Sequence, residues 1–122
     1  MIRLEADPAE VAGAVDVAAL LERVLVALRL TPEELATVRT ALTAQPCVLE
    51  VRPGAEIDDA IQRIRGGLCG RHKGVTLSTT RVWVLRLDWP GLLGHELAHV
   101  IRRILHQPED EAEARRVADA VG

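Results

Sequence analysis

PGLLGHELAHVIRRIL, residues 90–105, is the stretch of sequence that decides the fold. Its apolar residues recur at intervals of three and four positions, which is the spacing of one buried face of an α-helix. Proline at the first position favours a helix start there. The predicted buried face consists of Leu93, Leu97, Val100 and Ile104. His95 and His99 lie on the other side, so the segment predicts a helix with a core face and a separate polar face.

The two histidines of this helix are four positions apart, which places them on one face with Cβ atoms ~5–6 Å from each other. Both His95 and His99 can therefore reach one ion at ~2.0–2.1 Å, the usual length of a zinc–nitrogen bond. Glu96 projects about 100° further round the helix. From there it can hydrogen bond a water on the metal and accept its proton, which predicts a general base rather than a ligand.

A third protein ligand must come from downstream, because catalytic zinc sites use three protein ligands and leave one position for water. His106 is the nearest histidine to consider. In a straight helix it would lie ~10 Å along the axis from His99, and no glycine between them turns the chain back. We therefore reject His106 as a ligand.

A final helix, from about residue 109 to the end, returns alongside the first one if residues 107–108 form a tight corner. Its predicted buried stripe consists of Ala114, Val117, Ala118 and Val121. At a rise of about 1.5 Å per residue, Glu113 comes close to the level of His99 and borders that stripe. The sequence therefore favours Glu113 as the third ligand.

The other acids at the start of the final helix are predicted to be less suitable. Asp110 and Glu109 stop nearer the corner than Glu113 does, and Glu111 points away. Glu109 and Glu111 are interpreted as part of a solvated acidic first turn, which the helix dipole favours. Asp110 and Glu109 stay open as alternatives to Glu113.

The rest of the chain predicts helices and a small sheet. Thr31-Pro32-Glu33-Glu34 is a capping box with proline in the first turn, which starts a helix that ends near Ala44. In chain order, the predicted elements are helices over 7–29 and 31–44, a strand over 47–51, a helix over 56–65, a glycine-rich loop over 66–74, and a hairpin of strands 75–77 and 82–87. This order predicts an α+β fold, with N-terminal helices and a small antiparallel or mixed sheet.

The composition limits the classes of function. The chain has 122 residues, so we expect one domain over 1–122. Its net charge of −3 gives no long-range attraction to nucleic acid or to an anionic membrane. The sequence shows neither an apolar stretch of ~18 residues nor a signal peptide at its start. We therefore expect a cytoplasmic protein, in which Cys47 and Cys69 are free thiols.

HELAH at 95–99, followed by EAEAR at 111–115, resembles the motifs of short bacterial zincin metallopeptidases of the ImmA/IrrE kind, which are gluzincin-like. The resemblance covers roughly residues 75–118. It implies a zinc endopeptidase that hydrolyses peptide bonds in a protein or peptide substrate, with the active-site helix followed by a C-terminal helix. It also implies that His95, His99 and Glu113 hold the zinc and that Glu96 is the general base.

An enzyme of this kind needs a donor for the developing oxyanion. Tyrosine often has this role in zincins, and the chain contains no tyrosine. The possible replacements are His106, Arg102, Arg115, Arg103 and His72. An open sheet edge, at strand 75–77 or 82–87, would align an extended peptide substrate. The alternative is that both are ordinary core strands, which the sequence favours more for 82–87.

Two other interpretations follow from the same residues. Cys69 and His72 form a Cys-x-x-His without a partner pair, which favours a glycine-rich loop over a second metal site. The alternative function is a non-catalytic zinc-binding interaction module, associated with a phage or a toxin, that keeps the zincin fold. The small size and the missing tyrosine favour the module, whereas Glu96 favours the enzyme, because a structural zinc site has no need of it.

Overall fold

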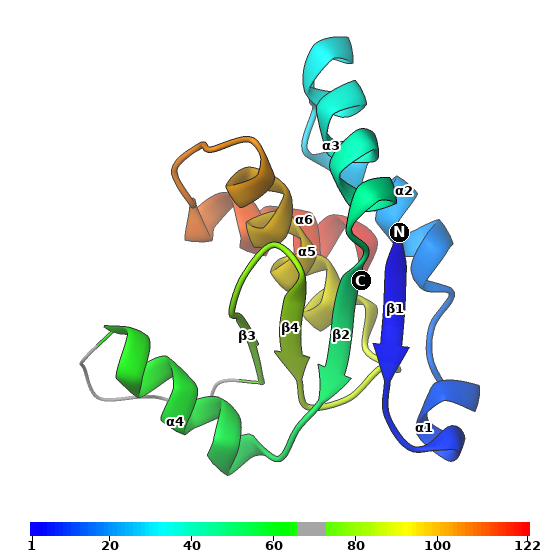
Figure 1. Cartoon of the computed structure of the whole chain (residues 1–122), viewed down its shortest axis with the longest axis vertical. Coiled ribbons are helices and arrows are strands. Elements are labelled where there is room, and N and C mark those ends of the chain that lie inside the picture. Colours follow the sequence, from blue (N-terminus) through cyan, green and yellow to red (C-terminus); the bar gives the residue numbers. More distant parts are fainter. Residues whose placement is uncertain (66–72) are drawn as a thin grey trace.

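The computed structural model describes residues 1–65 and 73–122. Within these residues the chain forms six helices and one four-stranded mixed sheet (Figure 1). The strands are β1 (Ile2–Glu5), β2 (Cys47–Val51), β3 (Gly74–Thr76) and β4 (Arg81–Val84). The helices are α1 (Pro8–Ala12), α2 (Val17–Ala27), α3 (Pro32–Ala44), α4 (Gly54–Arg65), α5 (Pro90–Ile104) and α6 (Glu111–Val121). The predicted α+β class is confirmed, and the sheet is the mixed kind.

The strand order is β1-β2-β4-β3, so β3 lies at an edge of the sheet. β1 pairs with β2 and β2 pairs with β4 in parallel, whereas β3 and β4 form an antiparallel hairpin. The hairpin was predicted; β3 is shifted by one residue from the expected 75–77, and β4 is shorter than the expected 82–87. In its register Val75 lies opposite Trp83, so these two side chains share one face of the sheet.

The main core lies between one face of the sheet and the helices α2, α3, α5 and α6 (Figure 1). The predicted stripe of α5 enters this core: Leu93, Leu97 and Val100 are buried, and Ile104 packs against them. α6 contributes Ala114, Val117 and Val121 to the same core. Burying the apolar stripes fixes the rotation of both helices, and it leaves the polar face of α5 turned toward β3 and the start of α6.

A smaller cluster covers the opposite face of the sheet beside β3. α4 places Ile57 and Ile61 against Val75, and Trp83 packs at the margin of the cluster. The amphipathic helix predicted over 56–65 is therefore confirmed, although it begins two residues earlier, at Gly54. Ile64, near its end, is 56% exposed.

α5 and α6 approach each other closely at Gly94. A Cβ atom at this position would lie 2.5 Å from Cγ2 of Val121, which is closer than real Cβ atoms come to a neighbour. Glycine at this position therefore permits α6 to pack directly on α5. This contact brings the first turn of α6 near the polar face of α5.

The N-terminal part of the chain differs from the prediction. The single helix expected over 7–29 is broken into α1 and α2, because Asp16 caps a new helix by accepting a hydrogen bond from the backbone N–H of Ala19. β1 was not predicted. The capping box of Thr31 and Glu34 is present and starts α3, as expected. In the glycine-rich loop, residues 66–72, which include Cys69 and His72, lie outside the described residues.

Candidate metal centre

His95 and His99 of α5 meet the carboxylate of Glu111, which is the first residue of α6. Oε2 of Glu111 lies 3.0 Å from Nε2 of His95, and Oε1 lies 2.8 Å from Nε2 of His99. The two imidazole rings are nearly perpendicular, with centroids 4.9 Å apart. These contacts direct both Nε2 atoms at one carboxylate.

The three side chains form a group that could hold one metal ion, because one ligand atom from each lies within 4.8 Å of the others. Bonds of about 2.0–2.2 Å to a tetrahedral ion place ligand atoms roughly 3.3–3.6 Å from each other. The separations within the group, at most 4.8 Å, are therefore close to those around a bound ion. Two imidazoles and a carboxylate suit several divalent first-row metals, so the donors alone leave the identity of the ion open.

The prediction that Glu111 points away is wrong, and Glu113 does not join the histidines. Glu113 instead accepts hydrogen bonds of 2.8 Å from Nε and Nη2 of Arg102. The last helix also starts later than predicted, and its two flanks carry the two acids. Asp110 caps α6 by accepting a hydrogen bond from the backbone N–H of Glu113, so the helix begins at residue 111 rather than near 109. Two helix positions differ by about 200°, so Glu111 and Glu113 face opposite ways.

A sequence signal for this start exists. Aspartate followed three positions later by glutamate is a common pattern at helix N-termini, and Asp110 and Glu113 fit it. Placing the helix start there makes Glu111 the first helical residue.

The electrostatics of the group support the ionised form of Glu111. Burial raises its pKa, but hydrogen bonds and charge interactions with His95 and His99 outweigh burial and hold its pKa below the ordinary value. The hydrogen bond that His95 donates to Glu96 raises the pKa of His95, burial opposes the rise, and Glu111 adds to it. Protons therefore compete with a metal for His95, because a histidine ligand must be deprotonated.

Glu96 is buried beside the metal-ligand group, at 3% exposure. Its Oε2 lies 2.8 Å from Nδ1 of His95, and its Oε1 accepts a hydrogen bond of 3.1 Å from the hydroxyl of Thr76. A proton on Nδ1 of neutral His95, donated to Glu96, leaves the Nε2 lone pair available to a metal. Thr76 and His95 together hold the Glu96 carboxylate in one orientation.

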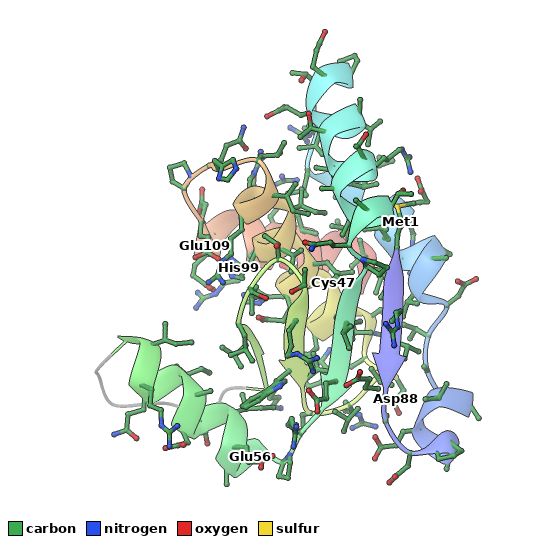
Figure 2. The ribbon with its side chains drawn as sticks, in the orientation of Figure 1. Met1, Cys47, Glu56, Asp88, His99 and Glu109 are labelled. Atoms are coloured by element: carbon green, nitrogen blue, oxygen red, sulfur yellow. The ribbon has the colours of Figure 1, made fainter. Side chains whose placement is uncertain are left out.

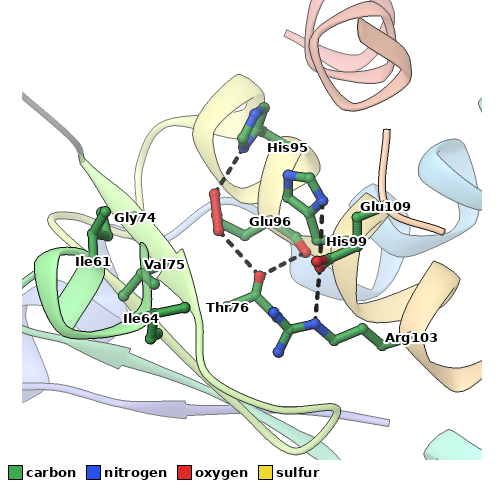
Figure 3. A pocket seen from close by; sticks show the side chains of 10 residues that line it. All are labelled: Ile61, Ile64, Gly74, Val75, Thr76, His95, Glu96, His99, Arg103 and Glu109. Carbon is green, nitrogen blue, oxygen red and sulfur yellow. Dashed lines mark hydrogen bonds and ion pairs between the residues drawn. The ribbon is translucent and has the colours of Figure 1, made fainter. Parts of the chain in front are cut away.

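A cavity of about 110 Å³ opens beside these residues (Figure 3). One wall is apolar and comes from α4 and β3, with Ile61, Ile64 and Val75. The other wall is polar and consists of Thr76, His95, Glu96, His99, Arg103 and Glu109. The cavity therefore offers apolar surface and ionisable groups to the same ligand.

The edge strand β3 borders this cavity. The backbone of β3 bonds to β4 at Lys73 and Leu77, through Leu85 N–H to Lys73 O and Leu77 N–H to Arg81 O. In an antiparallel ladder the intervening residues Gly74 and Thr76 direct their N–H and C=O groups away from the partner strand. These groups face outward at the edge next to the cavity.

Glu109 lies beside His99, where α5 meets the segment that leads to α6 (Figure 2). Its Oε1 is 3.6 Å from Nδ1 of His99 and accepts a hydrogen bond of 2.8 Å from Nε of Arg103. Glu109, which was predicted to be a solvated acid, therefore lies beside Nδ1 of His99, the ring nitrogen that does not contact Glu111.

Three of the candidate oxyanion donors, Arg102, His106 and Arg115, lie away from the cavity. Arg102 is bound to Glu113 and also donates to Gln107. His106 is exposed in the turn after α5, where its φ of 54° ends the helix, and Arg115 is exposed on α6. The cation that lines the cavity, among the described residues, is Arg103.

The pair of Arg102 and Glu113 predicts a pH-dependent contribution to stability. Hydrogen bonding to Arg102 holds the pKa of Glu113 below the ordinary value. Glu113→Gln is expected to lower the free energy of unfolding by about 1–3 kcal/mol at pH 7, because the variant loses a charged hydrogen-bonded pair. The difference should be complete above the ordinary glutamate pKa of about 4.3 and vanish as the pH falls through the lower folded-state pKa. Urea unfolding between pH 7 and pH 3 measures this, and a difference that does not change with pH would contradict it.

Comparison with known proteins found no matching family model, no matching curated protein and no matching solved structure. Within the described parts of the chain, each helix is too short or too polar to cross a lipid bilayer.

Proposed function

We propose that this chain is a zinc-dependent metallopeptidase, in which His95, His99 and Glu111 hold the zinc and Glu96 is the general base. The observation that carries the proposal is the convergence of these four side chains. Two imidazoles and one carboxylate are the ligand set of several catalytic zinc sites, and three ligands leave a position for water or substrate. The resemblance of HELAH to zincin motifs agrees with this assignment, with Glu111 in place of Glu113.

Zinc bound at this site would supply a Lewis acid that polarises the scissile carbonyl and lowers the pKa of a water molecule. Glu96 accepts a proton from the attacking water and returns it to the leaving amine. Thr76 and His95 orient the Glu96 carboxylate through the hydrogen bonds described above. The burial of Glu96 excludes bulk water, which strengthens its hydrogen bonds with Thr76 and His95.

The substrate we propose is an extended peptide that adds to the edge of the sheet. Gly74 and Thr76 of β3 direct backbone donors and acceptors outward next to the cavity, which is the arrangement that β-strand addition requires. A side chain at Gly74 would press on Glu96, because a Cβ atom there would lie 3.0 Å from its Cγ. Glycine therefore keeps the edge strand close to the base.

A cleavage assay tests the proposal. The zinc-loaded chain is incubated with a proteome-derived peptide library, and new termini are identified by mass spectrometry. We expect cleavage that stops when EDTA removes the metal and returns when zinc is added back, because catalysis needs the ligand group occupied. A chain that binds one zinc and produces no metal-dependent termini would favour the non-catalytic module, which the absence of tyrosine from the chain also favours.

A further inference from the structure

Arg103, a strong hydrogen-bond donor, lines the cavity beside the metal-ligand group and has no role in the function proposed above. Peptide hydrolysis places a negative charge on the carbonyl oxygen, and enzymes stabilise that charge with positioned donors. The chain contains no tyrosine that could be such a donor. Arg103 is the cation that lines the cavity within the part of the chain that the structure describes.

The position of Arg103 follows from the geometry of α5. His95, His99 and Arg103 succeed one another at intervals of four residues, which places them on one helix face with neighbouring Cβ atoms ~5–6 Å apart. The arginine thus extends the row of histidines by one turn. In Figure 3 its guanidinium group points across the cavity toward Thr76, whose hydroxyl contacts the base Glu96.

Glu109 anchors this guanidinium group by one edge. Nε of Arg103 donates to Oε1 of Glu109 at 2.8 Å, and the same oxygen lies 3.6 Å from Nδ1 of His99. A guanidinium has five N–H donors, so the bond from Nε leaves the four donors on Nη1 and Nη2 directed elsewhere. Among the described residues, no hydrogen bond engages them. The anchor fixes the arginine beside the metal-ligand group and presents its Nη atoms to the cavity.

We propose that Arg103 is a catalytic residue that donates from its Nη atoms to the oxygen of the attacked carbonyl; this inference rests on the proposed function. Water forms a bond to the carbonyl carbon while its proton passes to Glu96. The carbon–oxygen π electrons move onto the carbonyl oxygen, where Arg103 stabilises the charge. When the carbon–nitrogen bond breaks, the electrons return to the carbonyl and the nitrogen takes the proton from Glu96. Glu109 is a positioning residue for Arg103.

The affinities of two ligands distinguish a catalytic role of Arg103 from a structural role. A phosphinic analogue of Leu-Leu carries a tetrahedral oxyanion, and its leucine side chains suit the wall of Ile61, Ile64 and Val75. A mercaptoacyl-leucine amide binds zinc through sulfur and carries neither a tetrahedral oxyanion nor a carboxylate. Isothermal titration of the zinc-loaded chain measures both affinities without turnover.

We expect Arg103→Gln to weaken the phosphinic ligand about 100-fold and to leave the thiol ligand nearly unchanged. Arg115→Gln, an exposed arginine on α6, is the matched control and should change neither affinity. In the cleavage assay Arg103→Gln should lower kcat more than it raises KM, and guanidinium ion should partly restore the activity of Arg103→Ala. A structural role would weaken both ligands together and show no rescue.

The outcomes distinguish the two proposals. A wild-type chain that takes up no zinc overturns the proposed function and this inference with it. A chain that takes up zinc and binds the thiol ligand, but in which Arg103→Gln leaves the phosphinic affinity unchanged, overturns the role of Arg103 alone. A zinc-loaded chain that binds neither ligand at millimolar concentration likewise overturns the role of Arg103 alone.

Discussion

Glu111→Gln should lower the affinity of the chain for zinc by at least ~100-fold, above the 10- to 100-fold that loss of an outer-shell partner costs. Glu111 places one carboxylate oxygen on each histidine, at 3.0 Å and 2.8 Å. A neutral amide is a poor ligand for zinc, so the variant keeps two ligands where three are needed. Competition with a chromophoric chelator at pH 7.5 measures the affinity.

The matched control for this prediction is Glu113→Gln. It makes the same chemical change two residues away, on the side of α6 that faces Arg102. The variant should be less stable, yet bind zinc with nearly the wild-type affinity. If Glu113→Gln loses zinc and Glu111→Gln retains it, the ligand assignment is reversed and the sequence-based choice of Glu113 is right.

Glu96→Gln should reduce metal-dependent cleavage by about 10²- to 10⁴-fold, which is the usual contribution of general acid–base catalysis. The substitution keeps the shape of the side chain, and its amide oxygen can still accept the hydrogen bond from Thr76. The amide cannot take a proton from water. Zinc content should stay at the wild-type level, so the loss would be in the chemical step.

Two measurements make this prediction specific. Metal analysis of the purified variant establishes that the ligand group is intact, and circular dichroism establishes that the buried substitution has not unfolded the chain. Glu10→Gln, on the exposed surface of α1, is a control for loss of one negative charge. Cleavage by Glu96→Gln at the wild-type rate would assign the activity to another site or to a contaminant.

Local patterns in the sequence predicted the elements that depend on neighbouring residues. The spacing of apolar residues gave α5 and its buried stripe, and the capping box of Thr31 gave the start of α3. The same spacing predicted that His95 and His99 share a face, and the structure confirms that they do. Such features arise within about four residues of one another, so a sequence window contains their cause.

Features that depend on distant residues were not predictable in this way. β1 has only four residues, and it becomes a strand by pairing with β2. The edge position of β3 results from the order of strands in the sheet, which no local pattern encodes. Glu111 was missed for a related reason: Glu111 and Glu113 are about 200° apart on α6 and flank its buried stripe on opposite sides, so the packing of α6 on α5 decides which of them meets the histidines. Assigning the ligand therefore requires the packing of the two helices, which no local pattern encodes.

The direct packing of α6 on α5 also bears on the order in which the chain folds. Every proposed ligand and the base lie between residues 95 and 111, within a single pair of adjacent helices. The sheet, by contrast, closes only when Ile2 reaches Cys47, and closing so long a loop costs entropy before any contact repays it. Contacts that are near in sequence form faster than distant ones. We therefore expect α5 and α6 to be the nucleus of folding. The proposed metal ligands would then come together before the strands of the sheet pair.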